Sequence, residues 1–207
     1  MHCCETNYEA DGSWKTSISH YYYTTVGELF TGTLCAVALF MFTYVGYKKK
    51  EGDKWLSDSA TTTLAGIFAL GVIIFPASKD HCIQDNFRIF ISSDLVGGIH
   101  LTFAVGFFLM LAMMSIINFR RTDDPNKFGT TWQDKLYLMC GIGMLVCLAL
   151  IALYIALLEE KHIPWLECWN PVFSFEALAL QLFGLSWLTK GKVDFGYVLK
   201  RMGLMKK

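Results

Sequence analysis

The chain carries little charge for its length. Only 17% of its 207 residues are Asp, Glu, Lys or Arg, whereas 54% are hydrophobic, and soluble domains average about a quarter charged residues. Basic residues number 18 and acidic residues also number 18, so no positive excess is present to follow a phosphate backbone. The composition argues against a nucleic-acid partner and predicts a protein whose solvent is lipid.

Signatures of the common cofactor sites are also missing. The seven cysteines form no Cys-x-x-Cys pair and no zinc-type spacing with histidine. The pair Gly141-Ile142-Gly143 lies inside an apolar stretch and is not followed by the third glycine of a dinucleotide-binding loop. We therefore expect no cofactor. Residues 1–25 lack the basic and apolar regions of a secretory signal and are expected to form a short translocated tail.

Long apolar stretches dominate what is present. A helix needs roughly 20 apolar residues to cross a bilayer. Five stretches suit this role: Val26–Tyr47, Ala60–Ala77, Ile89–Phe119, Leu136–Leu158 and Val172–Leu188. We predict an all-α membrane protein in which residues 26–190 form one domain, a bundle of five transmembrane helices. The basic segment 191–207 follows it, as either an interfacial helix or a frayed tail.

The basic residues predict the orientation of the bundle, because loops rich in Lys and Arg remain in the cytoplasm. Four basic residues follow the first stretch, four follow the third and six follow the fifth, which places 14 of the 18 on one side. The N-terminus is therefore expected outside and the C-terminus in the cytoplasm. An odd number of crossings agrees with this assignment.

Only four ionisable residues fall inside the outer half of these stretches: Glu28, Asp94, His100 and Glu176. Such residues are costly in lipid and mark functional sites by default. We predict an outer-facing polar pocket formed by these four residues. The segment Ser17–Tyr23, with Ser19 and His20, is expected to roof it.

Each of these residues also has a purely structural interpretation. Asp94 follows two serines and could cap its helix, Glu28 could lie at the head-group level, and His100 could make one interhelical hydrogen bond. Glu176 is less easily explained in this way, because Asn170-Pro171 already supplies the helix start. A carboxyl group at that depth needs a partner or a proton.

Four cysteines lie on the expected outer side, where disulfides can form. A bridge between Cys82 and Cys168 would join the loop after the second helix to the loop before the fifth. Cys3 and Cys4 leave other pairings open, since the connectivity of four cysteines is not readable from sequence.

Several short phrases of the sequence are distinctive. They are Ser17-Ile18-Ser19 followed by Tyr21-Tyr22-Tyr23-Thr24, Ala65-Gly66-Ile67-Phe68-Ala69-Leu70-Gly71, Ile99-His100 with Phe107-Phe108, Asn170-Pro171-Val172-Phe173, Glu176-Ala177-Leu178-Ala179 and Phe183-Gly184-Leu185-Ser186-Trp187-Leu188-Thr189-Lys190-Gly191. Together they resemble a family of uncharacterised bacterial inner-membrane proteins, over nearly the whole chain from Thr16 to Gly191. The resemblance implies a multi-pass protein of the bacterial inner membrane and no particular activity.

A weaker similarity links the chain to the alkaline-ceramidase and progestin-receptor superfamily of membrane hydrolases, whose metal sites combine Ser, Asp and several His residues. The chain departs from that pattern, since it lacks paired histidines spaced by three in a late helix and has five helices rather than seven. If a metal were bound, His20, His100 and Glu176 are the expected ligands.

The function expected from these features is binding without catalysis, of a small or lipidic molecule or of a partner protein, in the outer-facing pocket. One alternative is an intramembrane metal-dependent lipid hydrolase, in which Glu176 would act as base toward a metal-bound water. Another is an oligomeric channel or transporter component. Small-residue pairs such as Gly32 with Ala36 could mediate a homo-oligomer.

Overall fold

The computed structural model describes residues 15–46, 55–77, 93–121, 131–157 and 169–191, without the side chains of residues 93 and 94. Every regular element in this part of the chain is helical, which confirms the predicted all-α class. The elements are η1 (Ile18–Tyr23), α1 (Gly27–Thr43), α2 (Asp58–Ile74), α3 (Ser93–Met113), η2 (Met114–Asn118), α4 (Trp132–Leu157) and α6 (Pro171–Lys190).

Three of the helices are long and apolar enough to cross a membrane: Leu95–Asn118, Trp132–Leu157 and Pro171–Lys190. The other two apolar helices, α1 and α2, are 17 residues each, or about 25 Å at 1.5 Å per residue. They are slightly shorter than the roughly 30 Å hydrocarbon core of a bilayer. Three helices thus have the length and composition of membrane spans, as expected of a membrane protein, and the count of five crossings remains a prediction.

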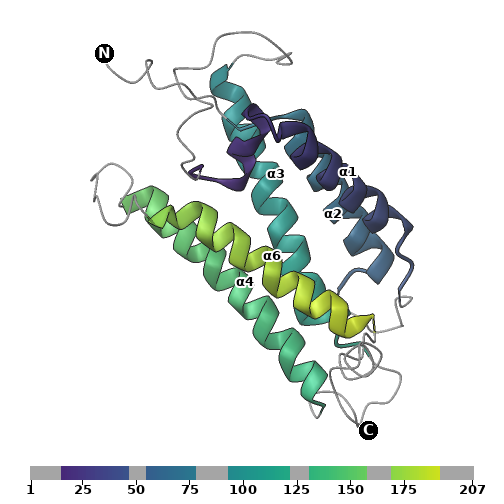
Figure 1. Ribbon diagram of the computed structural model, residues 1–207. Coiled ribbons are helices and arrows are strands. Elements are labelled where there is room, and N and C mark those ends of the chain that lie inside the picture. Colours follow the sequence, from purple (N-terminus) through teal and green to yellow (C-terminus); the bar gives the residue numbers. More distant parts are fainter. Residues whose placement is uncertain (1–14, 47–54, 78–92, 122–130, 158–168, 192–207) are drawn as a thin grey trace, which may run out of the picture.

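The helices form two antiparallel pairs joined by α3 (Figure 1). Helices α4 and α6 lie side by side, and α1 packs on α2 in the same way. Helix α3 contacts α2 along its length and also touches α4, so it connects the two pairs. This arrangement leaves α1 and α6 facing each other in front of α3.

The helix ends follow local rules. Ser57 caps α2, because its hydroxyl accepts a hydrogen bond from the amide of Ala60 at 3.2 Å. Helix α2 ends at Ile74, just before Phe75-Pro76, since a proline disfavours helical backbone in the residue before it. Pro171 occupies the first turn of α6, as its sequence predicts.

One helical irregularity is invisible in the sequence pattern. Helix α3 passes into a π turn, η2, in which the amide of Phe119 donates to the carbonyl of Met114 at 2.9 Å. A π turn inserts one residue into the helical register. It changes which side chains face α2 and which face α4 at this end of the bundle.

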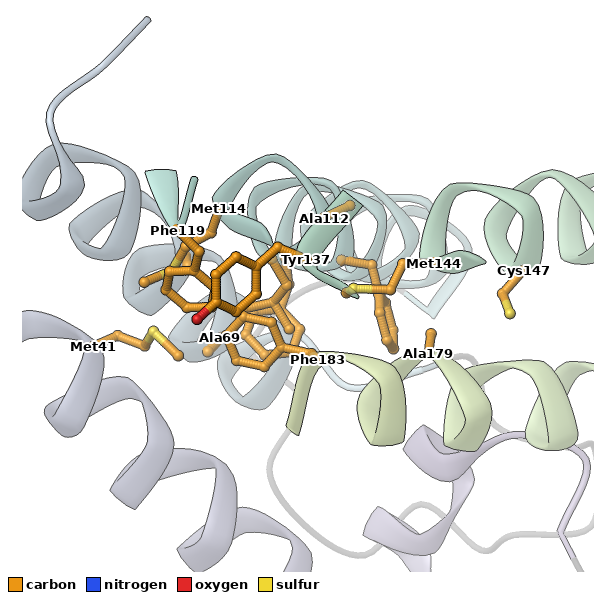
Figure 2. Close-up of a cluster of buried hydrophobic side chains, with 14 of the residues drawn as sticks. Met41, Ala69, Ala112, Met114, Phe119, Tyr137, Met144, Cys147, Ala179 and Phe183 are labelled. Carbon is orange, nitrogen blue, oxygen red and sulfur yellow. The ribbon is translucent and has the colours of Figure 1, made fainter. Parts of the chain in front are cut away.

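The core lies where α3 meets the two pairs (Figure 2). Phe119 is at its centre, with ring centroids 5.7 Å from Tyr137 of α4 and 6.2 Å from Phe183 of α6. Leu111 and Met144 are almost completely buried beside them. These contacts tie the α4 and α6 pair to α3 by close side-chain packing, the main source of stability between helices in lipid.

Small residues allow the helix backbones to approach closely. A Cβ atom on Gly66 of α2 would lie 3.1 Å from the carbonyl oxygen of Ala38 in α1. One on Gly141 of α4 would lie 3.0 Å from the carbonyl oxygen of Ala112 in α3. Both seams are therefore tightly packed, in contrast to the boundary between α1 and α6.

Candidate functional site

A groove of about 610 Å³ lies between α1 and α6, with α3 as its floor. Apolar side chains form nearly all of its wall, among them Leu34 of α1, Phe107 of α3 and Leu180 of α6. Its volume falls within the roughly 300–1,000 Å³ of ligand pockets in proteins. We call this cavity the α1–α6 groove.

Each end of the groove is closed by a different element. At one end the indole of Trp187 packs on the rings of Phe40 and Tyr44 of α1, with centroids 5.1 and 5.0 Å apart. At the other end Ile18 and Tyr21 of η1 line the wall. We call this second end of the bundle the η1 end.

Glu176 is the acidic residue that lines the groove. Its carboxyl oxygens accept hydrogen bonds from the Ser17 hydroxyl, at 3.1 and 2.9 Å, and from the Ile18 amide, at 2.8 Å. No Lys, Arg or His of the described ranges contacts this carboxyl group. Glu176 thus joins η1 to α6 through neutral donors alone.

Two further hydrogen bonds hold η1 in place. The amide of Phe173 donates to the carbonyl of Thr16 at 3.0 Å, and the hydroxyl of Tyr23 donates to the carbonyl of Ala77 at 2.7 Å. Burial, with a smaller contribution from Tyr22, raises the pKa of Tyr23 to about 12. The Tyr23 hydroxyl therefore remains a hydrogen-bond donor throughout the physiological range.

His100 occupies a different place from the one predicted. Its imidazole is buried, and Nδ1 lies 2.7 Å from the carbonyl oxygen of Phe75 at the end of α2. His100 is not part of the groove wall. It satisfies a carbonyl that the end of α2 leaves without a helical partner, which matches its structural interpretation.

The remaining predicted site residues are dispersed. Ser19 lines the groove at its η1 end, and Nδ1 of His20 lies 2.7 Å from the Thr16 hydroxyl. Glu28 is exposed on the outer face of α1. The side chain of Asp94 and both disulfide candidates, Cys82 and Cys168, lie outside the described residues.

The three residues considered as metal ligands are not brought into one cluster. His20, His100 and Glu176 each have different hydrogen-bond partners, as given above. Within the described segments no group of three or more His, Cys, Asp or Glu side chains could hold a metal ion. The geometry supplies no positive support for the metal-hydrolase hypothesis.

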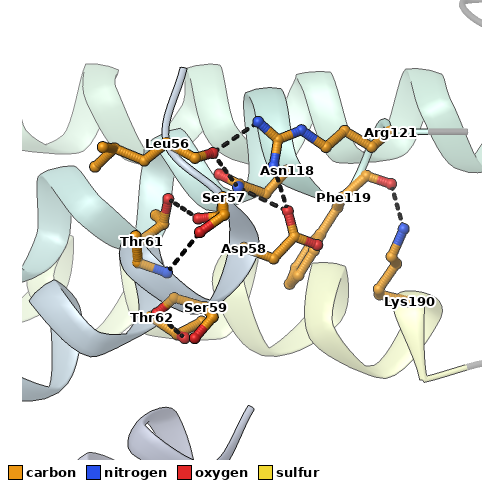
Figure 3. Close-up of polar contacts among 11 residues, drawn as sticks. Leu56, Ser57, Asp58, Ser59, Thr61, Thr62, Asn118, Phe119, Arg121 and Lys190 are labelled. Atoms are coloured by element: carbon orange, nitrogen blue, oxygen red, sulfur yellow. Dashed lines mark hydrogen bonds and ion pairs between the residues drawn. The ribbon is translucent and has the colours of Figure 1, made fainter. Parts of the chain in front are cut away.

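The opposite end of the bundle holds a compact ionic cluster, which we call the arginine end (Figure 3). Asp58 is completely buried, and its Oδ1 accepts hydrogen bonds from Arg121 Nη1 and from Asn118 Nδ2, both at 2.8 Å. Arg121 also donates through Nη2 to the Leu56 carbonyl at 2.6 Å. This network ties the start of α2 to the residues after η2.

Two more contacts extend the arginine end to α4 and α6. Nε of Arg120 donates to the carboxylate of Asp134 at 3.0 Å. Nζ of Lys190 donates to the carbonyl of Phe119 at 2.8 Å. Each charged side chain therefore contacts a neighbouring element. Together these contacts connect α2, the end of α3 with η2, α4 and α6.

This cluster was not predicted from the sequence. The second helix was expected to begin at Ala60, and the basic residues after the third stretch, Arg120 and Arg121 among them, served only to predict the orientation. The sequence Ser57-Asp58-Ser59 does carry the signal of a helix cap followed by an acidic first turn. Arg121, the partner of Asp58, follows the π turn η2, and the sequence pattern does not predict that turn.

No family model, curated protein or solved structure matches this chain. The resemblance to bacterial inner-membrane proteins therefore stays a prediction.

Proposed function

We propose that this protein binds a bilayer lipid, with one acyl chain lying in the α1–α6 groove. The observation that carries the proposal is the groove itself, an apolar cavity bounded by two helices in a membrane protein. We further propose that the chain crosses the bacterial inner membrane five times with its N-terminus outside. The η1 end then lies toward the outer leaflet.

The dimensions of the groove suit an acyl chain. Its wall extends from Val26 to Met41 on α1 and from Glu176 to Leu188 on α6, which correspond to about 22 and 18 Å at 1.5 Å per residue. One leaflet contributes about 15 Å to the hydrocarbon core. An extended chain from a single leaflet therefore fits within the groove.

The chemistry of the wall favours a lipid over an aqueous path. A channel for ions or polar solutes needs polar groups or water along its length, whereas this wall is apolar apart from a few residues such as Thr33 and Ser19. Binding requires no catalytic group, and it agrees with the non-enzymatic function expected from the sequence.

The experiment that tests the proposal fills the groove. Gly184 lines the groove, and a Cβ atom there would meet nothing within 4 Å, so the side chain of Gly184→Phe starts from open space and is expected to occupy the cavity. Gly32 is equally open but lies outside the groove wall, which makes Gly32→Phe the matched control. Native mass spectrometry from mild detergent counts the lipids retained by each protein.

We expect the wild type and Gly32→Phe to retain one tightly bound lipid and Gly184→Phe to lose it. Equal retention by all three proteins would overturn the proposal, because lipids held on the outer surface are indifferent to the groove. Absence of retained lipid from the wild type would overturn it as well.

A further inference from the structure

We infer that the α1–α6 groove selects a lipid whose head group carries an ammonium, and that the Glu176 carboxylate binds that ammonium. The inference rests on the proposed lipid-binding function and adds the chemical class of the head group. It is carried by the contacts of Glu176 and by its position in the groove wall.

The hydrogen bonds of Glu176 leave room for another donor. A carboxylate offers about four acceptor positions, and Ser17 and Ile18 make three contacts with it. Glu176 also borders the cavity. A head group at the η1 end therefore meets an acceptor that the described residues do not saturate.

The charged residues of the groove wall also favour an ammonium head group. Glu176 is half-buried, and its hydrogen-bond donors among the described residues, the Ser17 hydroxyl and the Ile18 amide, are both neutral. No basic residue is among those that line the groove. The described groove residues therefore offer no cation to an anionic head group, whereas an ammonium would donate to the Glu176 carboxyl group and act as its counter-ion.

The aromatic ring of Tyr21 adds a second contact suited to a cation. Tyr21 lines the groove at the same end as Glu176 and packs against Phe173, with ring centroids 6.0 Å apart. Ammonium groups are attracted to the faces of aromatic rings. Carboxylate and ring together would hold the head group while the acyl chain extends toward Trp187.

The test is a lipid competition on the full-length protein. The protein is reconstituted in nanodiscs containing equal amounts of phosphatidylethanolamine and phosphatidylglycerol, extracted into mild detergent and analysed by native mass spectrometry. We expect the retained lipid to be enriched in phosphatidylethanolamine by about tenfold, the size of effect that a hydrogen bond to a charged group produces. This wild-type measurement requires no variant to fold.

Two variants then distinguish the contribution of the Glu176 charge from that of its hydrogen bonds to Ser17. Glu176→Gln removes the negative charge and should return the retained lipids to the bulk ratio. Ser17→Ala removes hydrogen bonds to the same carboxyl group but keeps the charge, so it should keep the preference. If Ser17→Ala loses the preference as fully as Glu176→Gln, the η1 fold rather than the charge is responsible and the inference is overturned.

The remaining outcomes distinguish this inference from the function on which it rests. A retained lipid with the bulk ratio in the wild type overturns ammonium selection and leaves lipid binding intact. No retained lipid, or a second copy of the chain in its place, overturns the proposed function and the inference together.

Discussion

The two ends of the bundle place a carboxyl group in opposite surroundings. At the arginine end, Asp58 is completely buried and lies 2.8 Å from the guanidinium of Arg121. At the η1 end, Glu176 receives hydrogen bonds from a hydroxyl and an amide, and no described cation touches it. The first carboxylate is surrounded by packed side chains, whereas the second borders a cavity.

This difference separates a structural role from a binding role. A buried acid with its counter-ion in contact holds elements together, and removing one partner leaves an uncompensated charge. A carboxyl group beside a cavity can still accept a hydrogen bond from a ligand that enters the cavity. The following predictions test the distinction, from the largest expected effect to the smallest.

Asp58→Ala should produce the largest loss of stability. It removes the completely buried carboxylate that pairs with Arg121, and breaking a buried ion pair costs about 3–5 kcal/mol. Thermal unfolding of the detergent-solubilised protein measures the effect, with Ser59→Ala, on the exposed side of the same turn, as control. Adding Arg121→Met should recover part of the loss, and similar stability of Asp58→Ala and the control would contradict the structural role.

Glu176→Ala should have a smaller and local effect. The Ser17 hydroxyl and the Ile18 amide lose their acceptor; both are half-buried, so the loss should be about 1 kcal/mol, the low end of the range for an unsatisfied donor. Hydrogen exchange should accelerate at the amides of η1 and stay unchanged in α4. Global unfolding at a lower temperature, as for Asp58→Ala, would show that the two ends do not differ.

Tyr23→Phe removes one hydrogen bond to Ala77 and should destabilise the η1 end by about 1 kcal/mol. The pKa of Tyr23 rises from 10.0 to about 12 on folding. Its protonated form therefore stabilises the fold fully below pH 10, and this contribution is lost as the pH rises toward about 12. Thermal unfolding across this range should show the wild type approaching the variant, and a constant difference would contradict the burial of Tyr23.

Gly184→Phe should have the smallest effect on stability, because its Cβ position is open. Its unfolding temperature should match that of Gly32→Phe, although only Gly184→Phe blocks the groove. Marked destabilisation by Gly184→Phe alone would mean that the groove is closed in the membrane-embedded protein.

Much of the helical fold follows from hydrophobic run lengths. The five predicted stretches each contain a helix, and Pro171 and Pro76 give two of the boundaries correctly. Periodicity does not reveal the neighbours of a helix, so the sequence could not show that α1 and α6 face each other across a groove. The π turn of η2, which precedes Arg121, was equally invisible in the sequence.

The candidate site was only partly accessible from sequence for the same reason. Glu176 stood out because its helix start was already explained by Asn170-Pro171, and the structure places Ser17 and Ile18 on it. His100 stood out for its cost in lipid, yet it bonds a carbonyl of α2. The residues of the groove wall could not be recognised in the sequence, because lipid-facing and groove-facing side chains are both apolar.

The most direct test of the central claim is the position of a bound acyl chain. The protein is reconstituted with a phosphatidylethanolamine that carries a photoreactive group midway along one acyl chain, and the labelled residues are mapped by mass spectrometry. We predict that labelling concentrates on groove residues such as Leu34 and Leu180. Labelling spread over exposed lipid-facing residues such as Met139 and Leu153 of α4, with no excess in the groove, would contradict the account.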